Sequence, residues 1–413
     1  MKPRYGVSPW IQQFPNDRRP DYPRFRGELT ADVVIVGGGL TGCATAQACA
    51  AAGMKVVLLE RDRVGQGSSG RSPGLLLPDP GPSFRDVAAA HGLRAARHAF
   101  ESWRHGSVEA AALLRRLKIK CSVEPQPLVA VAARGDEKLF RKEYEAREAA
   151  GLEFAWLSQK QVKSALSIDA PVGVRMRDGF TLDPYRACLG MADAAARRKA
   201  VFFERSLVKK VRFAAKHVDI TTDGGLIHAA TIVVATGSAT AEFRALRRHF
   251  KRREMYQVLT APLAATVRKQ MGRRDAILRD APSTPLGAGQ TPPHRLRWTG
   301  DDRVLIAGAD QEETPEKLRA SVRVQRTGQL MYELLMTYQA ISGLQPEYGW
   351  ETSYGDTADG LMYIGAHRNY PRHLFALGGA RDSVTGSFLA ARILLRALQD
   401  ESDTGDRVFG WAR

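Results

Sequence analysis

Three glycines early in the chain have the spacing of a nucleotide-binding turn. Gly37, Gly39 and Gly42 fit the pattern G-x-G-x-x-G, and Glu60 follows 18 residues after the last of them. In such a turn the first glycine allows a sharp bend, the second lets backbone N–H groups approach a pyrophosphate, and the third lets a helix pack closely. A carboxylate at Glu60 can accept hydrogen bonds from ribose hydroxyls and would repel a 2′-phosphate. This pattern indicates a dinucleotide that lacks that phosphate, or, as the plainer alternative, a structural turn only.

The residues around these glycines predict the elements that must position them. Residues 33–36 and 56–59 are continuous apolar runs, typical of strands buried on both faces of a parallel sheet. Residues 40–52 are rich in alanine and predict a helix whose N-terminus, at Leu40 and Thr41, directs partial positive charge toward a phosphate. A membrane anchor is the alternative for this stretch. Its glycine, threonine and glutamine residues argue against that alternative, because they make a poor lipid-facing surface.

A second apolar strand is predicted to end at small residues. It runs into Ala235, Thr236 and Gly237. A buried parallel strand that stops in this way leaves room for a ligand at the carboxyl edge of its sheet. We therefore interpret this strand end as a second nucleotide contact.

Length, charge and cysteines narrow the class of protein. A chain of 413 residues has room for two or three domains. The net charge is +17, and basic residues cluster at 244–253 and 268–274. The clusters are read as a solvated basic face, with steering of anionic substrates or contact with an anionic membrane surface as alternatives, and no nucleic-acid partner is expected. The four cysteines have no metal-ligand spacing, so we expect buried thiols, no metal site and, without a signal peptide, a cytoplasmic protein.

Taken in order, these motifs resemble the superfamily of FAD-dependent D-amino-acid oxidases, glycine oxidases and sarcosine oxidases, with the gamma-glutamylputrescine oxidase branch nearest in pattern. The similarity covers nearly the whole chain. The further matching stretches are SPWIQQFP (8–15), GSSGRS (67–72), LDP (182–184), Val208 after Glu204, RLRWTGDDRVLIAG (295–308), and Thr357, Asp359 and Gly365.

The resemblance implies an α/β fold with two domains. A discontinuous, Rossmann-like FAD-binding domain of the glutathione-reductase type would comprise residues 28–80, 180–240 and 346–413. A mixed-sheet α+β substrate domain would comprise 81–179 and 241–345, and residues 1–27 would form an N-terminal extension.

The resemblance also implies the cofactor, the reaction and the residues that contact them. FAD would accept a hydride from the carbon beside an amine nitrogen, and the imine would then hydrolyse. The substrate would be an amine or amino acid, with an anionic group expected from the basic balance of the chain and from Arg297 and Arg381. The residues expected to contact FAD are Gly37, Gly39, Leu40, Thr41, Gly42, Glu60, Arg61, Ser68, Ser69, Arg71, Ser72, Val208, Ala235, Thr236, Gly237, Gly378, Gly379, Ser383 and Thr385.

The sequence departs from the family pattern at three places. The flavin loop continues as Arg71, Ser72, Pro73 and Gly74 where relatives have R-N-G-G, and because it contains no histidine we expect noncovalent FAD. Arg295 and Leu296 replace a tyrosine pair, and Arg381 and Ser383 replace small residues in the C-terminal loop. Arg381 is expected either near the flavin or in a surface ion pair with Asp382. These departures leave open a flavin-binding protein with altered or lost catalysis, acting as a subunit or regulator, and the electron acceptor remains oxygen, a quinone or a carrier protein.

Overall fold

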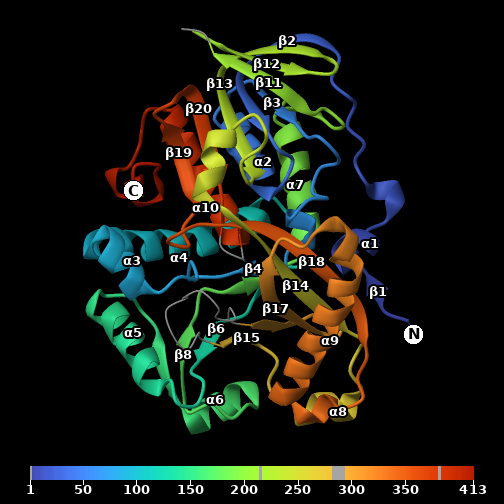
Figure 1. The fold of residues 1–413 in the computed structure, drawn as a ribbon, viewed down its shortest axis with the longest axis vertical. Helices are drawn as coiled ribbons and strands as arrows, with labels where there is room; N and C mark the ends of the chain where they lie inside the picture. The colour runs from blue at the N-terminus through green and yellow to red at the C-terminus, as the bar shows by residue number, and fades with distance from the viewer. Residues whose placement is uncertain (1, 214–215, 281–293, 380–382) are drawn as a thin grey trace.

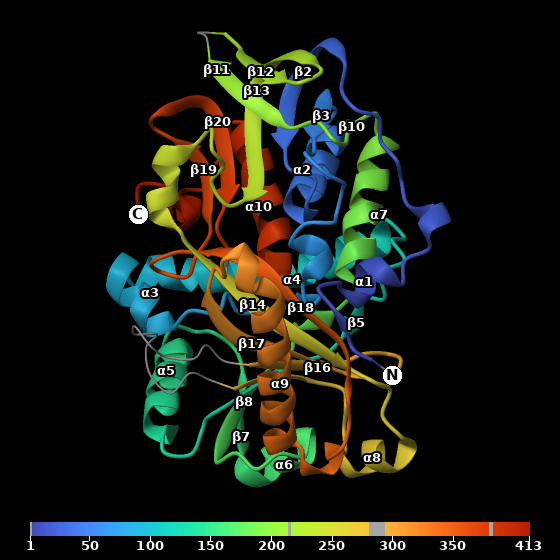
Figure 2. The same ribbon diagram turned by 45° about the vertical axis from the view of Figure 1, so that its right-hand side comes forward.

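The computed structural model describes residues 2–213, 216–280, 294–379 and 383–413, and it contains two large sheets that lie one above the other (Figure 1). The upper sheet carries the predicted nucleotide-binding turn. The lower sheet lies beneath it, and Figure 2 shows the same arrangement turned by 45°.

In the described part of the chain, eight strands form the upper sheet. Six follow the order β10-β3-β2-β13-β12-β11, and β20 joins β13 and pairs with β19. The strands are β2 (Gly27–Val36), β3 (Val56–Leu59), β10 (Val201–Phe203), β11 (Val208–Phe213), β12 (Val218–Thr222), β13 (Gly225–Gly237), β19 (Tyr363–His367) and β20 (Tyr370–Leu377). β13 pairs with parallel β2 along one edge. Along its other edge, its first residues pair with antiparallel β12 and its last residues with parallel β20. The carboxyl ends of β2, β13 and β20 therefore meet at one edge.

Helices pack on this sheet through small side chains. α2 (Leu40–Ala51) and α10 (Ser383–Leu398) pack directly on the sheet, and α7 (Pro184–Ala196) and α4 (Leu93–Arg116) pack against these two helices. α2 packs against both α7 and α10, and α10 also packs against α4. Alanine and cysteine supply much of this core, so the helix axes can approach closely.

Nine strands of the described chain form the lower sheet, in the order β1-β18-β14-β17-β16-β15-β6-β8-β7. They are β1 (Arg4–Tyr5), β6 (Leu128–Val131), β7 (Ala155–Ser158), β8 (Val172–Met176), β14 (Lys251–Thr260), β15 (Ile277–Asp280), β16 (Arg295–Trp298), β17 (Val304–Glu312) and β18 (Pro346–Asp356). Helix α9 (Arg319–Thr337) covers β14, β17 and β18 on one face. Trp350 of β18 packs near Trp10 of the N-terminal helix, and Leu75, which lies outside this sheet, packs against β6 and β8.

The remaining elements connect the two sheets. A small sheet joins β4 (Leu75–Leu76), β9 (Phe180–Thr181) and β5 (Glu124–Pro125). The other helices are α1 (Pro9–Gln12), α3 (Phe84–His91), α5 (Glu137–Ala149), α6 (Gln159–Leu166) and α8 (Ala265–Gln270).

The predicted fold class is confirmed, with local corrections. The strand predicted at 33–36 extends back to Gly27, and residues 84–116, whose alanine, leucine and arginine side chains have helical spacing, form two helices. Gly92, with φ of 86°, separates α3 from α4 because this backbone angle lies outside the helical range. Residues 346–413 contribute to both sheets, since β18 belongs to the lower sheet and β19 and β20 to the upper one.

Candidate functional site

The predicted glycine turn packs without side chains. Gly37 has φ of 110°, and a Cβ there would lie 2.6 Å from the carbonyl oxygen of Ala235, at the end of β13. A Cβ on Gly42 would overlap the carbonyl oxygen of Gly37. Gly39, the residue before the first turn of α2, has no side chain to occupy this end of the helix, and the N–H of Leu40 donates to Ser69 Oγ. The N-terminus of α2 is therefore open to an anionic group.

Glu60 lies directly beside this turn. Its Oε2 accepts a hydrogen bond of 2.6 Å from the N–H of Gly38, and its Oε1 accepts one of 2.8 Å from the N–H of Asp62. Each oxygen keeps a second lone pair for a ribose hydroxyl. The neighbouring Arg61 is exposed and pairs with Asp62.

The segment before β11 is bonded to the Glu60 segment. The N–H of Ser206 donates to the carbonyl oxygen of Glu60 at 2.8 Å, and β11 begins two residues later at Val208. Glu204 is buried, its Oε1 accepts from the N–H of Val64, and burial raises the pKa of its carboxyl group. The structure thus brings Val208 to the same edge as Glu60.

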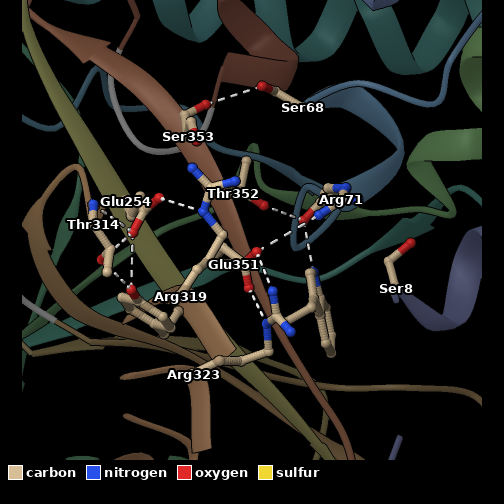
Figure 3. A network of polar contacts seen from close by, with 12 residues as sticks. Ser8, Ser68, Arg71, Glu254, Thr314, Arg319, Arg323, Glu351, Thr352 and Ser353 are labelled. Atoms are coloured by element: carbon tan, nitrogen blue, oxygen red, sulfur yellow. Dashed lines mark hydrogen bonds and ion pairs between the residues drawn. The ribbon is translucent and has the colours of Figure 1, made fainter. Parts of the chain in front are cut away.

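The predicted flavin loop is held at both ends by serines. Ser69 Oγ accepts from the N–H of Leu40 at 2.8 Å, which ties the loop to the start of α2. Ser68 Oγ donates to the carbonyl oxygen of Ser353 on β18 at 2.9 Å (Figure 3). Ser72 is buried, and its Oγ accepts from the N–H of Gly74 at 3.1 Å.

Arg71 joins this loop to the lower sheet. Its carbonyl oxygen accepts hydrogen bonds from Gln257 Nε2 (2.7 Å), Trp350 Nε1 (2.9 Å) and Thr352 Oγ1 (2.6 Å). Its guanidinium lies 3.9 Å from Glu351, which Arg323 of α9 binds through two hydrogen bonds (Figure 3). The main chain of the loop is therefore fixed to β14 and β18.

The strand end at Ala235, Thr236 and Gly237 meets the C-terminal loop. The N–H of Gly378 donates to the carbonyl oxygen of Gly237 at 3.0 Å, and the N–H of Gly379 donates to that of Gly355 on β18 at 3.2 Å. Thr236 Oγ1 donates to the carbonyl oxygen of Ser238. Arg381 and the side chain of Ser383 lie outside the described residues.

The start of α10 meets both the glycine turn and the chain after the flavin loop. Thr41 Oγ1 donates to Ser387 Oγ at 2.9 Å, and Thr385 Oγ1 donates to the carbonyl oxygen of Leu77 at 3.0 Å. The predicted FAD residues from 37–42, 68–72 and 378–385 therefore belong to one continuous set of contacts, apart from those outside the described residues.

Two residues beyond Leu77 lies a buried ion cluster, here defined as Asp79, Glu143, Arg147 and Arg279. Arg279 binds Asp79 through two hydrogen bonds of 2.9 and 3.1 Å, and Arg147 binds both Asp79 and Glu143. Burial alone would raise the pKa of Asp79, but the two guanidinium groups lower it below its usual range. No motif of the sequence indicated this cluster, because Asp79 and Arg279 are 200 residues apart.

Arg297 is buried on β16. Its Nη1 donates to the carbonyl oxygens of Gly74 (2.6 Å) and Leu182 (3.0 Å), and its guanidinium lies over the ring of Trp10. Burial lowers the pKa of Arg297 to about 10. It lines a cavity of about 230 Å³ together with Trp10 and Asp183. The hydrogen bonds of Arg297 therefore fix the end of the flavin loop against β9.

Buried thiols lie behind the glycine turn. Cys43 of α2 and Cys188 of α7 each lie 3.6 Å from the carbonyl oxygen of Gly38, and their sulfur atoms are 3.7 Å apart. All four cysteines are free and buried, as predicted. Burial raises the pKa of Cys49 and of Cys121 to about 12.

The residues present fit a dinucleotide. A turn that leaves no room for a Cβ at Gly37 or Gly42, a helix that begins after a glycine and an acid at the end of the next strand together define a Rossmann-type dinucleotide-binding protein. The chain belongs to the DAO family of FAD-dependent oxidoreductases, whose model matches residues 32–397. The predictions of family, FAD cofactor and enzyme class are thereby confirmed.

Individual relatives agree with this family. Over 386 residues the chain is 23% identical to gamma-glutamylputrescine oxidoreductase of Escherichia coli K12, covering 92% of this chain and 86% of that protein. Glycine oxidase from Geobacillus kaustophilus has a TM-score of 0.72 at 18% identity, covering 93% of this chain and 99% of that one. L-Amino acid deaminase from Proteus myxofaciens has a TM-score of 0.74 at 15% identity, covering 96% of each chain. At these identities the solved structures support the fold.

Across the described residues, no helix combines the length and the apolar content that crossing a bilayer requires.

Proposed function

We propose that this FAD-dependent oxidoreductase oxidises the C–N bond of an amine or amino acid. The observation that carries the proposal is the ordered flavin cradle, in which the glycine turn, the serine-anchored loop and the start of α10 are bonded to one another. The relatives named above act on amine or amino-acid substrates by their names, which supports this substrate class.

Bound FAD supplies the redox chemistry, accepting a hydride from the carbon beside the nitrogen, after which the imine hydrolyses. The protein's own task is to hold and orient the reactants. The N-terminus of α2 would stabilise the pyrophosphate charge, and Glu60 would accept the ribose hydroxyl hydrogen bonds. Ser68, Ser69 and Arg71 would fix the loop beneath the ring system, which supports noncovalent binding.

Arg61, Ser72, Val208 and the residues of the two loops complete the proposed contacts. Val208 would contact adenine through its main chain, since the segment before it is bonded to Glu60. Thr236, Gly237, Gly378, Gly379, Ser383 and Thr385 would surround the other end of the cofactor.

The substrate is proposed to carry an anionic group. Arg297 and Arg381 are the candidates for binding it, and the net charge of +17 supports steering of an anion toward the site. The hydrogen bonds of Arg297 to Gly74 and Leu182 support an added positioning role for this residue.

We further propose that residues 28–80, 180–240 and 346–413 form the FAD-binding domain and 81–179 and 241–345 the substrate domain, after an extension of residues 1–27, with β18 at the start of the last FAD-binding segment extending into the lower sheet. A cytoplasmic location and an acceptor that is oxygen, a quinone or a carrier protein are also proposed. The basic face at 244–253 would permit peripheral contact with an anionic membrane. The alternative function is a flavin-binding subunit or regulator with altered or lost catalysis.

One experiment tests cofactor and reaction together. Purified protein should be yellow, acid precipitation should release FAD, and an anionic amine should bleach the flavin under anaerobic conditions. Gly39→Asp should purify colourless, because it places bulk and negative charge at the pyrophosphate position. A yellow protein that no member of a broad amine panel bleaches would support the alternative, and full flavin content in Gly39→Asp would contradict the site.

A second experiment addresses the arginines. Arg297→Ala should raise the half-saturating concentration of anionic amines steeply, since losing one partner of a desolvated ion pair costs about 2–5 kcal/mol. Arg381→Ala should lower the flavin midpoint potential and weaken sulfite binding if Arg381 faces the flavin. An unchanged potential would place Arg381 on the surface, and equal turnover of neutral and anionic amines would contradict the anionic substrate.

A further inference from the structure

Three side chains far from the glycine turn bring metal-binding chemistry together. His217 precedes β12, Asp219 lies in β12, and His228 lies in β13, directly opposite Asp219 in the antiparallel register. One ligand atom from each of the three lies within 4.8 Å of the other two. These strands stand side by side at the top of Figure 1, at the end of the upper sheet away from the proposed FAD site.

The distances suit a small, tetrahedral ion. Asp219 Oδ1 lies 3.2 Å from His217 Nε2 and 2.6 Å from His228 Nδ1. Zinc–nitrogen and zinc–oxygen bonds of about 2.0–2.2 Å place neighbouring ligands roughly 3.3 Å apart in a tetrahedron. The first distance already matches, and the second needs to open by well under 1 Å, which side-chain rotation supplies without moving the strands.

A fourth residue prepares His228 for this role. The Nε2 of His228 lies 3.1 Å from Glu28 Oε1 on β2, the strand paired with β13 on its other side. A metal-binding histidine usually donates its second ring N–H to a carboxylate, which fixes its tautomer and raises its basicity. Without the ion, Nδ1 of His228 donates to Asp219 Oδ1 at 2.6 Å; an ion bound between them would displace this proton and leave the remaining one on Nε2, toward Glu28.

The charges also favour a dication. The carboxylates of Asp219 and Glu28 supply two negative charges around His228, which one divalent ion balances when it displaces the ring proton from Nδ1. Arg212 is opposite Asp219 in β11, yet within the described residues the two side chains form no ion pair. The second candidate metal cluster among those residues, His98 with Asp403 and Asp406, differs because Arg396 pairs with both carboxylates.

We propose that His217, Asp219 and His228 bind one divalent transition-metal ion of the zinc class, with Glu28 orienting His228. The ion would join β12 to β13 at the outer end of the upper sheet. It is a structural site, independent of flavin chemistry and of the proposed substrate. No ligand motif in the sequence indicates this metal site, because the three residues meet across a hairpin.

Calorimetric titration with zinc sulfate tests the site in untagged, flavin-loaded protein that has been treated with a chelator. We expect one zinc ion per chain with a micromolar or lower dissociation constant. Asp219→Asn, which keeps the shape of the side chain, and His228→Ala should each weaken binding about 100-fold, and Glu28→Gln about 10-fold. His98→Gln, the matched control, should bind zinc as the wild type does.

Thermal unfolding provides the second readout. Zinc should raise the unfolding midpoint of the wild type and of His98→Gln, but not that of Asp219→Asn. Flavin absorbance confirms that each variant is folded. Absence of saturable binding at one ion per chain, or unchanged binding in Asp219→Asn, would overturn the proposal, and loss of binding in His98→Gln alone would move the ion to the other group.

Discussion

The glycine turn and the buried ion cluster each hold separate segments of this molecule together, and they do so in opposite ways. The turn works because Gly37 and Gly42 carry no Cβ where the chain folds back on Ala235 and on Gly37 itself. The ion cluster works because Asp79, Arg147 and Arg279, from three distant segments, bring full charges together out of water. The turn is disrupted by adding an atom, and the ion cluster by removing a charge.

The largest effect is expected at the turn. Gly42→Ala would force a methyl group into the carbonyl oxygen of Gly37, so the strand–helix junction must open and the cofactor site must distort. We expect protein without flavin, measured by the ratio of flavin to protein absorbance. Gly328→Ala in α9 is the matched control, because open space surrounds that position and its flavin content should be normal. Equal flavin content in the two variants would show that the turn tolerates side chains.

The next effect concerns the ion cluster. Asp79→Asn leaves two buried guanidinium groups facing a neutral amide, and we expect the free energy of unfolding to fall by about 3–5 kcal/mol in chemical denaturation. Because the folded-state pKa of Asp79 is lowered, its stabilisation is present above the unfolded pKa near 3.8 and is lost as the pH falls through the folded value.

The control for Asp79 is Asp193, whose ion pair with Arg197 is exposed. Asp193→Asn should change the free energy of unfolding by less than about 1 kcal/mol. If the two variants unfold alike, burial does not set the strength of these pairs.

A third and smaller effect tests a histidine version of the ion cluster. His294 lies between Asp280 (2.6 Å) and Glu333 (2.9 Å), and these carboxylates raise its pKa to about 10 although burial alone would lower it. Its stabilisation is therefore complete below about pH 6.5 and is lost as the pH rises through about 10. We expect His294→Gln to lower the free energy of unfolding by about 1–3 kcal/mol at pH 7.

Denaturation of both proteins at pH 7 and pH 10 measures this difference, which should shrink at the higher pH. His105→Gln, at an exposed histidine, should behave as the wild type at both. A difference that stays constant with pH would mean that His294 acts by packing and not by charge.

The smallest effect marks the border of the glycine turn. Arg61 is exposed and paired with Asp62, so Arg61→Ala should weaken FAD binding only about 2-fold, which is about 0.4 kcal/mol. Glu60→Gln should weaken it more, because Glu60 is bonded to Gly38 within the turn. Fluorescence titration of the two variants with FAD compares them, and a larger loss in Arg61→Ala would extend the turn's site outward.

The same contrast decides what the sequence could predict. The turn was predictable because its strand, glycines, helix and acid follow one another, and β3 and the start of α2 lie where the pattern placed them. The break at Gly92 was not predicted, since a single glycine is often tolerated within a helix. The hydrogen bonds that hold Arg71 come from Gln257, Trp350 and Thr352, more than 180 residues away, and no local pattern encodes such pairs.

The reaction rates of the buried thiols behind the turn report how often this part of the protein unfolds locally. Alkylating reagents attack the thiolate form of cysteine. Cys43, Cys49 and Cys188 are buried, and a pKa of about 12 keeps Cys49 protonated. Reagent can reach them only when α2 or α7 separates from the sheet. The rate at which each cysteine is alkylated, followed by mass spectrometry peptide by peptide, therefore times local unfolding of the cofactor-binding half. In the same experiment, the alkylation rate of Cys121, which lies between α4 and β5, reports local unfolding of a neighbouring segment.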